Sequence, residues 1–195
     1  DSLNLDITEN TSQYLSIVFH QFLQKESEKL TIRINNYLVR PFNPFPIQNI
    51  RGLGPSLLKL KNEEIRIEGF VLPNIAIKES KEKNNIWTPN NKSLMDMEGI
   101  YIYRNNRLIL YSGWNGLIKK MPRLQLGRLK IDIGNKVDHL FHLNVAKSQI
   151  NIPHDLKNAF LRAIVDLKTE AQKEYFNHGL KSFKQRPTEY SSELF

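Results

Sequence analysis

The sequence predicts an α+β domain, in which a mostly antiparallel sheet is covered on one face by two long helices. Three observations lead to this prediction: segments that alternate apolar and polar residues, Asn pairs between some of these segments, and two stretches with apolar residues at helical spacing. Tight turns join antiparallel strands, and an amphipathic helix near each end of the chain can cover one face of such a sheet.

The first predicted helix spans residues 12–25. Thr11 or Ser12 is suited to cap its start, and the polar run from Gln24 to Lys29 ends it. Its apolar residues recur every three or four positions and so form one stripe. The stripe consists of Tyr14, Leu15, Val18, Phe19, Phe22 and Leu23.

Two hairpins are predicted, at 30–39 and 99–111. Each has an Asn pair between two alternating segments, Asn35-Asn36 in the first and Asn105-Asn106 in the second. Asn tolerates the positive φ that tight hairpin turns need. Further strands are predicted at 64–72 and 128–133.

Two other stretches are less regular. Residues 47–62 show no clear pattern. Residues 78–93 are polar and charged without a period, which predicts an exposed excursion that carries one apolar side chain, Trp87.

The strongest helical pattern follows Pro153, a residue suited to the first turn of a helix. Gly179 is suited to close this helix in the left-handed conformation. We therefore expect one domain over residues 1–179 and a tail or linker over 180–195. The predicted apolar stripe consists of Leu156, Ala159, Phe160, Ala163, Ile164, Leu167 and Ala171.

Composition limits the class of protein. The 195 residues are 40% hydrophobic and include no cysteine, which excludes disulfides, thiolate metal sites and Cys nucleophiles. This composition fits a reducing compartment, so we expect a cytoplasmic protein with no membrane-spanning segment. Because the chain begins at Asp1, we interpret it as a piece of a longer protein. The net charge of +8 favours anionic partners such as nucleic acid or nucleotide phosphate.

Three segments carry a resemblance to a known family. They are the hairpin from Gly99 to Ile109, which leads from Arg104 through an Asn pair into Arg107-Leu108-Ile109, the strand 128–133, and Asn144-Val145-Ala146-Lys147. In this order they resemble the second domain, the transducer, of the GHKL ATPases, a superfamily that includes DNA gyrase B subunits, MutL and MORC proteins and large heat-shock chaperones. The last segment resembles the MutL sequence Asn-Val-His-Pro-Ala-Lys but lacks its His-Pro.

The resemblance implies a fold like domain 2 of ribosomal protein S5 and a role for Lys147. In the family, a lysine on a loop of this domain reaches the γ-phosphate of ATP held with Mg by a preceding N-terminal domain. An ammonium group suits a terminal phosphate because it is a compact charge with three donors. Lys147 would thus couple ATP binding and hydrolysis to domain closure or to dimerisation as a homodimer. The segments that bind ATP in this family are absent, so we expect this chain alone to be non-catalytic and without a cofactor.

Other candidate sites have simpler alternatives. Gly52-Leu53-Gly54 lacks the strand–loop–helix context of a phosphate loop and fits a plain turn. His139 and His142, with Asp138 or His154, have a spacing that allows a metal site, but no dense cluster of ligands supports one, and surface or packing roles are the simpler explanation.

The hairpin tyrosines leave a second function open. Tyr101, Tyr103 and Tyr111 alternate near Arg104 and Arg107, and aromatic residues interleaved with arginine can stack on bases. Cross-strand packing is the simpler explanation. With the net charge of +8, this pattern supports the alternative function, a basic nucleic-acid-binding module without an ATP role.

Overall fold

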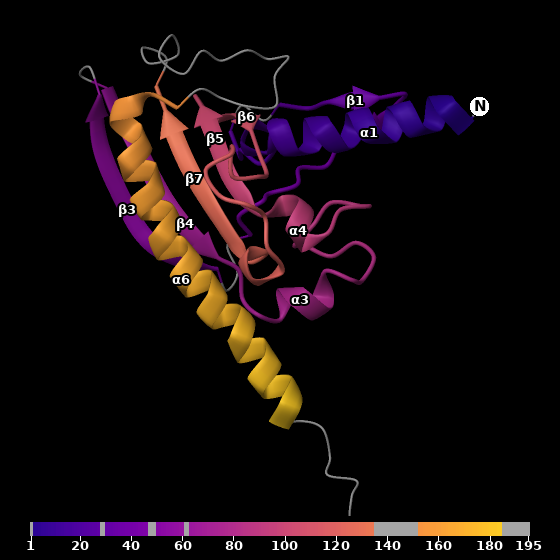
Figure 1. Ribbon diagram of the computed structural model, residues 1–195. Coiled ribbons are helices and arrows are strands. Elements are labelled where there is room, and N and C mark those ends of the chain that lie inside the picture. The colour runs from indigo at the N-terminus through magenta and orange to yellow at the C-terminus, as the bar shows by residue number, and fades with distance from the viewer. Residues whose placement is uncertain (1, 28–29, 47–49, 61–62, 135–151, 185–195) are drawn as a thin grey trace, which may run out of the picture.

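The computed structural model describes residues 2–27, 30–46, 50–60, 63–134 and 152–184 (Figure 1). In this part of the chain, five strands form the main sheet in the order β3-β4-β7-β5-β6. The pairing of β5 with β7 is parallel, and the other three pairings are antiparallel. The predicted α+β class and the mostly antiparallel sheet are therefore confirmed. The strands are β3 (Arg51–Leu60), β4 (Glu63–Val71), β5 (Gly99–Arg104), β6 (Arg107–Leu110) and β7 (Gly127–Ile133).

Both predicted hairpin turns are confirmed. A separate small sheet pairs β1 (Arg33–Ile34) with β2 (Tyr37–Leu38), and β5 pairs with β6 in the main sheet. All four turn asparagines have positive φ, between 46° and 66°. The Asn pairs thus set the turns locally, as the sequence indicated.

The stretch without a clear sequence pattern contains the edge strand β3. Pro55 is tolerated there because an edge strand leaves backbone N–H groups unpaired, and the register shifts between Gly52 and Pro55. Gly52-Leu53-Gly54 therefore lies at an irregularity of an edge strand and is neither a plain turn nor a phosphate loop. Arg51 in this strand forms an ion pair of 2.6 Å with Glu170.

The last helix, α6 (His154–Lys184), packs along the sheet (Figure 1). Its predicted stripe faces β4 and β7, and five of its residues are buried: Leu156, Phe160, Ile164, Leu167 and Ala171. They share a core with Ile100, Ile102, Leu129 and Ile131. The helix continues through Gly179 to Lys184, so the predicted end at Gly179 is wrong. A glycine in a helix costs only about 1 kcal/mol, so it need not end one.

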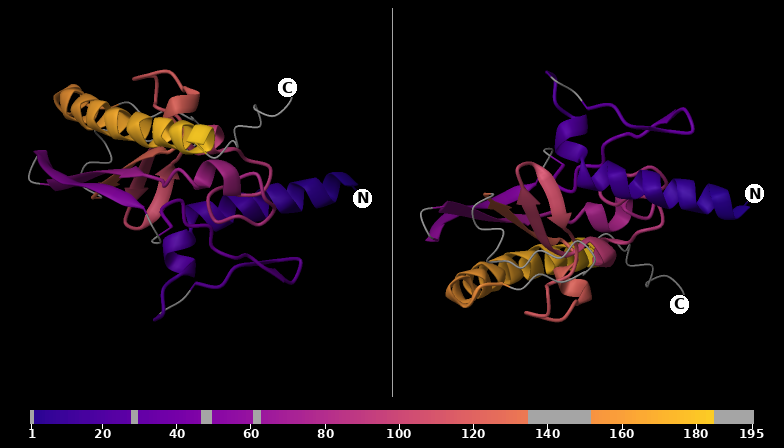
Figure 2. Two further views of the ribbon diagram at one scale, coloured as in Figure 1. Left: turned by 90° about the horizontal axis from the view of Figure 1, so that it is seen from below. Right: turned by 90° about the horizontal axis from the view of Figure 1, so that it is seen from above.

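The first helix lies on the other face of the sheet. Figure 2 shows α6 and α1 (Ser2–Val18) on opposite sides of the strands. Side chains alternate along β5, so that Ile100 and Ile102 join the core under α6 while Tyr101 and Tyr103 pack with Ile17 of α1. The expectation that both long helices cover one face is therefore wrong.

The boundaries of the first helix also differ from the prediction. The chain is helical from Ser2, and the helix is interrupted at Phe19 before a short helix, α2 (His20–Leu23). Thr11 lies inside α1 and its hydroxyl donates to the carbonyl of Ile7, so it is not a cap. Tyr14, assigned to the stripe, is 46% exposed, and Ile17 takes the buried position.

Three short elements complete the described fold. They are α3 (Ala76–Glu79), α4 (Leu94–Met97) and a 3-10 helix at Pro122–Leu124. Ser93 and Asp96 form a capping box at the start of α4. Within the described residues, no helix has the length and apolar character needed to cross a membrane.

Candidate functional site

Lys147, the residue assigned to the ATP γ-phosphate, lies outside the described residues, as does all of Asn144-Val145-Ala146-Lys147. The order of the elements nevertheless shows between which strand and helix Lys147 lies in the chain. The segment 135–151 connects the end of β7 to the start of α6, and these two ends lie at the same end of the sheet (Figure 1). The lysine therefore belongs to the connection between a central strand and the helix that covers it.

The candidate metal ligands Asp138, His139 and His142 also lie outside the described residues. His154 is exposed in the first turn of α6. Among the residues that the structure describes, no group of three or more His, Asp or Glu side chains is placed to hold a metal ion.

The hairpin tyrosines have packing roles. Tyr101 and Tyr103 are buried, and the hydroxyl of Tyr103 lies 2.8 Å from Nε2 of His20. Burial raises the pKa of Tyr101 to about 12, and its hydroxyl donates to the carbonyl of Met97. The ring of Phe45 packs edge-on against Tyr101, with centroids 5.1 Å apart. These two tyrosines cannot stack on bases, so for them the packing interpretation is confirmed.

Arg128 is a buried cation on the same face of the sheet. Its guanidinium donates to the carbonyl of Pro44 and, at 2.7 Å, to the carbonyl of Trp87. Desolvation lowers the pKa of Arg128, but the neighbouring Tyr101 and Tyr103 oppose this. Burying a guanidinium is costly unless its donors are used. Both terminal nitrogens of Arg128 donate, while its buried Nε has no partner among the described residues. Arg128 thus joins β7 to two segments far away in the sequence.

Glu98 is a second buried ionisable group, next to the start of β5. Its Oε1 accepts hydrogen bonds from the indole of Trp114 at 3.1 Å and from the backbone N–H of Met121 at 3.0 Å. Burial raises the pKa of this carboxyl. Because its partners belong to the segment after β6, Glu98 holds that segment against the sheet.

The segment predicted as an exposed excursion is an ordered loop. Asn85 holds it together: its Oδ1 accepts from the backbone N–H groups of Trp87 and Thr88, each at 2.8 Å, and its Nδ2 donates to the carbonyl of Glu82 at 3.0 Å. Trp87 is buried and its indole donates to Glu79 at 2.7 Å. Sequence periodicity could not reveal this order because it comes from side-chain bonds to the backbone.

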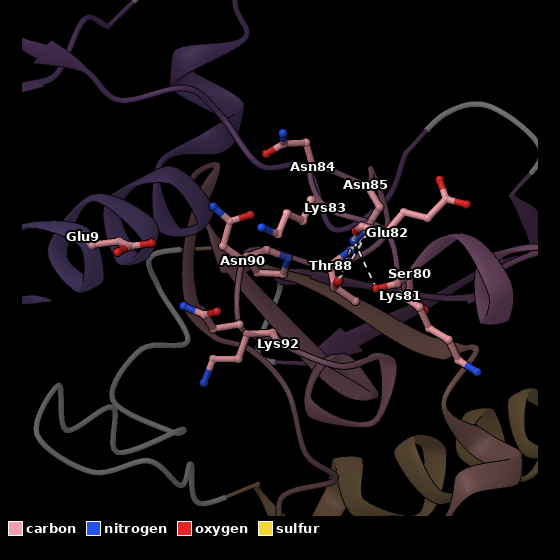
Figure 3. Close-up of a pocket in the computed structure, with 12 residues that line it drawn as sticks. Glu9, Ser80, Lys81, Glu82, Lys83, Asn84, Asn85, Thr88, Asn90 and Lys92 are labelled. Carbon is pink, nitrogen blue, oxygen red and sulfur yellow. Dashed lines mark hydrogen bonds between the residues drawn. The ribbon is translucent and has the colours of Figure 1, made fainter.

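This loop forms one wall of a hollow opposite α1 (Figure 3). The hollow has a volume of about 350 Å³, and its lining is rich in lysine and amide side chains, with Glu9 contributed by α1. The side-chain amide of Gln13 on α1 donates to the carbonyl of Asn90, which fixes the loop relative to the helix. The loop side chains of the lining include Lys81, Lys83, Asn84, Asn90, Asn91 and Lys92.

Three further hollows continue this one. A larger hollow of about 860 Å³ shares Asn85 and Asn90 with it and reaches Tyr37, Arg40 and Phe42. The next shares Phe42 and Asn85 with the large hollow, and the last shares Asn43 and Gln24 with its neighbour. The last hollow is lined by His20, Phe45, Phe70 and Lys130, among others. Successive hollows share lining residues and so adjoin one another, and we call this series of hollows the amide groove.

Sequence reasoning missed this groove. Its signal is present as the lysines and asparagines of residues 81–92, but the opposite wall comes from residues 8–16 and 34–43. No family model and no curated protein matches the chain. The functional interpretation therefore depends on the residues themselves.

Proposed function

We propose that the chain is the transducer domain of a GHKL-type ATPase, with a fold like domain 2 of ribosomal protein S5. In this proposal an N-terminal ATP-binding domain of the same polypeptide holds ATP and Mg. Lys147 contacts the γ-phosphate across the domain boundary. The chain alone is non-catalytic, and the longer protein hydrolyses ATP.

The observation that carries the proposal is the order of elements around Lys147. The hairpin β5–β6 is followed by β7, which pairs in parallel with β5, and then by the connection that holds Lys147 and by α6. These are the segments whose sequences resemble the transducer, and the described ones form one continuous part of the sheet.

The packing suggests how phosphate contact would be transmitted. The connection that bears Lys147 leads directly into α6, whose buried residues Phe160 and Ile164 rest on the sheet. A charge contact that draws in this connection would act on the start of a helix of 31 residues. Docking with bound triphosphate and release after hydrolysis is a known form of switch. It would drive domain closure or the formation of a homodimer.

An ATPase assay on the full-length protein tests the proposal. We expect Lys147→Ala to lower kcat at least about tenfold, which corresponds to 1.4 kcal/mol of lost transition-state stabilisation. Lys157→Ala, which removes an exposed lysine from α6, is the matched control and should leave the rate unchanged. The isolated chain should show no activity. Equal rates for both variants, or hydrolysis by the isolated chain, would refute the proposal.

The sequence also left open a nucleic-acid-binding module, and one observation favours it. The amide groove contains more basic than acidic side chains, in a chain of net charge +8. This second function needs no nucleotide and is compatible with the first.

A further inference from the structure

We propose that the amide groove binds a single strand of nucleic acid, with phosphates against its lysines and arginine and with bases against its aromatic and amide side chains. The proposal gives a place and a ligand class to the second function above. It does not depend on the ATP role of Lys147.

Charge is the first argument. The groove is lined by Arg40, Lys81, Lys83, Lys92 and Lys130, against Glu9 and Glu82. Arg40, Lys83 and Lys92 are exposed, so their charges are available to a ligand. Lys81, Lys83 and Lys92 line the first hollow and Arg40 lines the second. Lys130 lines the last hollow and forms an ion pair of 3.1 Å with Asp132. This distribution fits a ligand that carries its negative charges at intervals.

The aromatic side chains are the second argument. Tyr37, on the hairpin that borders the large hollow, is 78% exposed, so its ring is open to a ligand. Phe42 lines the same hollow and is partly buried. Any of the bases can stack on such a ring, and each stacked base contributes about 1–3 kcal/mol of binding free energy.

The amides are the third argument. Asn84 and Asn90 are exposed at the edge of the first hollow, and Asn84 has a positive φ of 60°. Side-chain amides carry both a donor and an acceptor, as do the edges of unpaired bases. The bonds of Asn85, and that of Gln13 to Asn90, hold this wall in place before any ligand binds. Because the wall is already ordered, binding a ligand costs less conformational entropy.

These features together favour a single strand over other polyanions. In a duplex the bases are paired and stacked, so the aromatic and amide side chains of a groove would contact little of it. An acidic peptide would satisfy the cations and could bond to the amides through its backbone, but its acidic side chains have no flat ring to stack on Tyr37. The groove matches the combination of a cationic track and stacking platforms found in proteins that bind single strands.

Fluorescence anisotropy with a labelled oligothymidylate of about 20 nucleotides tests the proposal, because site sizes of about 4–16 nucleotides per small fold are typical. The measurement uses the chain without nucleotide over a series of salt concentrations. The variants are Lys83→Ala with Lys92→Ala, Tyr37→Ala, and a control, Lys157→Ala with Arg162→Ala, which removes two exposed charges from α6 on the opposite face of the sheet.

We expect the wild-type chain to bind the oligonucleotide more tightly than a duplex or a polyglutamate peptide. The double lysine variant should bind more weakly, and its slope of log K against log salt should fall by about 0.7 for each phosphate that it no longer neutralises. Tyr37→Ala should weaken binding about tenfold with an unchanged slope. The control should lose less affinity than the double lysine variant.

Three results would overturn the proposal. They are no binding at low salt, an equal loss in the control and groove variants, and tighter binding of polyglutamate that the same groove variants abolish. The last result would identify a site for an acidic protein. None of these results would bear on ATP hydrolysis, so failure here is distinguishable from failure of the transducer proposal.

Discussion

At the scale of single residues, the described structure is notable for ionisable groups in its interior. His20 is 2% exposed, its Nε2 faces the Tyr103 hydroxyl, and its Nδ1 lies 3.4 Å from Oε1 of Gln24. Burial, with a smaller contribution from Lys130, lowers the pKa of His20 to about 4. The imidazole is thus neutral at neutral pH and serves as a hydrogen-bonding part of the core.

This lowered pKa predicts a loss of stability in mild acid. Between pH 6.5 and about 4 the unfolded chain binds a proton at His20 that the folded chain does not, so stability falls as the pH falls through this window. The full effect is on the order of 3 kcal/mol. His20→Gln keeps an amide near Tyr103 but does not titrate. Urea unfolding across this range should therefore show a shallower loss for the variant than for the wild type.

Other groups titrate in both proteins, so the comparison is the difference between the two curves. If the stability of both proteins fell equally with pH, His20 would not have the lowered pKa, and the prediction would be wrong. A variant less stable at pH 7 but with a shallower acid limb would still support the prediction, because the slope and not the absolute stability carries the proton count.

At the scale of elements, the start of β5 depends on a close approach of two glycines. Gly99 has a φ of 126° and forms a parallel bridge with Gly113, and the carbonyl of Gly113 accepts from Ile100 at 2.8 Å. A Cβ at Gly99 would collide with the Gly113 backbone. The segment after β6, which Glu98 also holds, could then no longer lie against the strand.

We therefore expect Gly99→Ala to lower the free energy of unfolding by at least about 2 kcal/mol, from the collision and from backbone strain. Gly52→Ala is the matched control. Gly52 is also a strand glycine, but the added methyl would meet only side chains at 3.7 and 3.8 Å, and the change should cost less than about 1 kcal/mol. Thermal unfolding of both variants checks this. Similar melting temperatures for the two would contradict it.

Elements governed by local chemistry were predictable from the sequence. The Asn pairs set both hairpins, and the stripe of α6 gave its buried face. Long-range packing was not predictable. Amphipathic stripes do not say which face of a sheet a helix covers, and the order of residues 80–92 depends on Asn85 and on the distant Arg128. For a site, the sequence offered only Lys147, by resemblance, and this residue lies outside the described residues. The walls of the amide groove were not predictable because they are assembled from several separate parts of the sequence.

At the scale of the whole molecule, Arg128 connects the sheet to both walls of the amide groove. From β7 it reaches the carbonyl of Pro44, next to Asn43 in the groove, and the carbonyl of Trp87, next to Thr88. The buried side chain of Arg128 thus holds two segments together. One contains Pro44, 84 positions before Arg128 in the sequence, and the other contains Trp87, 41 positions before it. A lysine keeps the charge but lacks the planar fork that can serve two carbonyls at once.

We expect Arg128→Lys to lower the free energy of unfolding by about 1–3 kcal/mol, the cost of leaving a buried carbonyl unpaired. It should also weaken oligothymidylate binding without changing the salt slope, because no groove charge is removed. Lys157→Arg, which exchanges one basic residue for another at an exposed position of α6, is the control. It should change neither the free energy of unfolding nor the affinity for oligothymidylate. Anisotropy at temperatures where the variant is fully folded separates the two effects. If the folded variant bound like the wild type, Arg128 would stabilise the fold without shaping the groove.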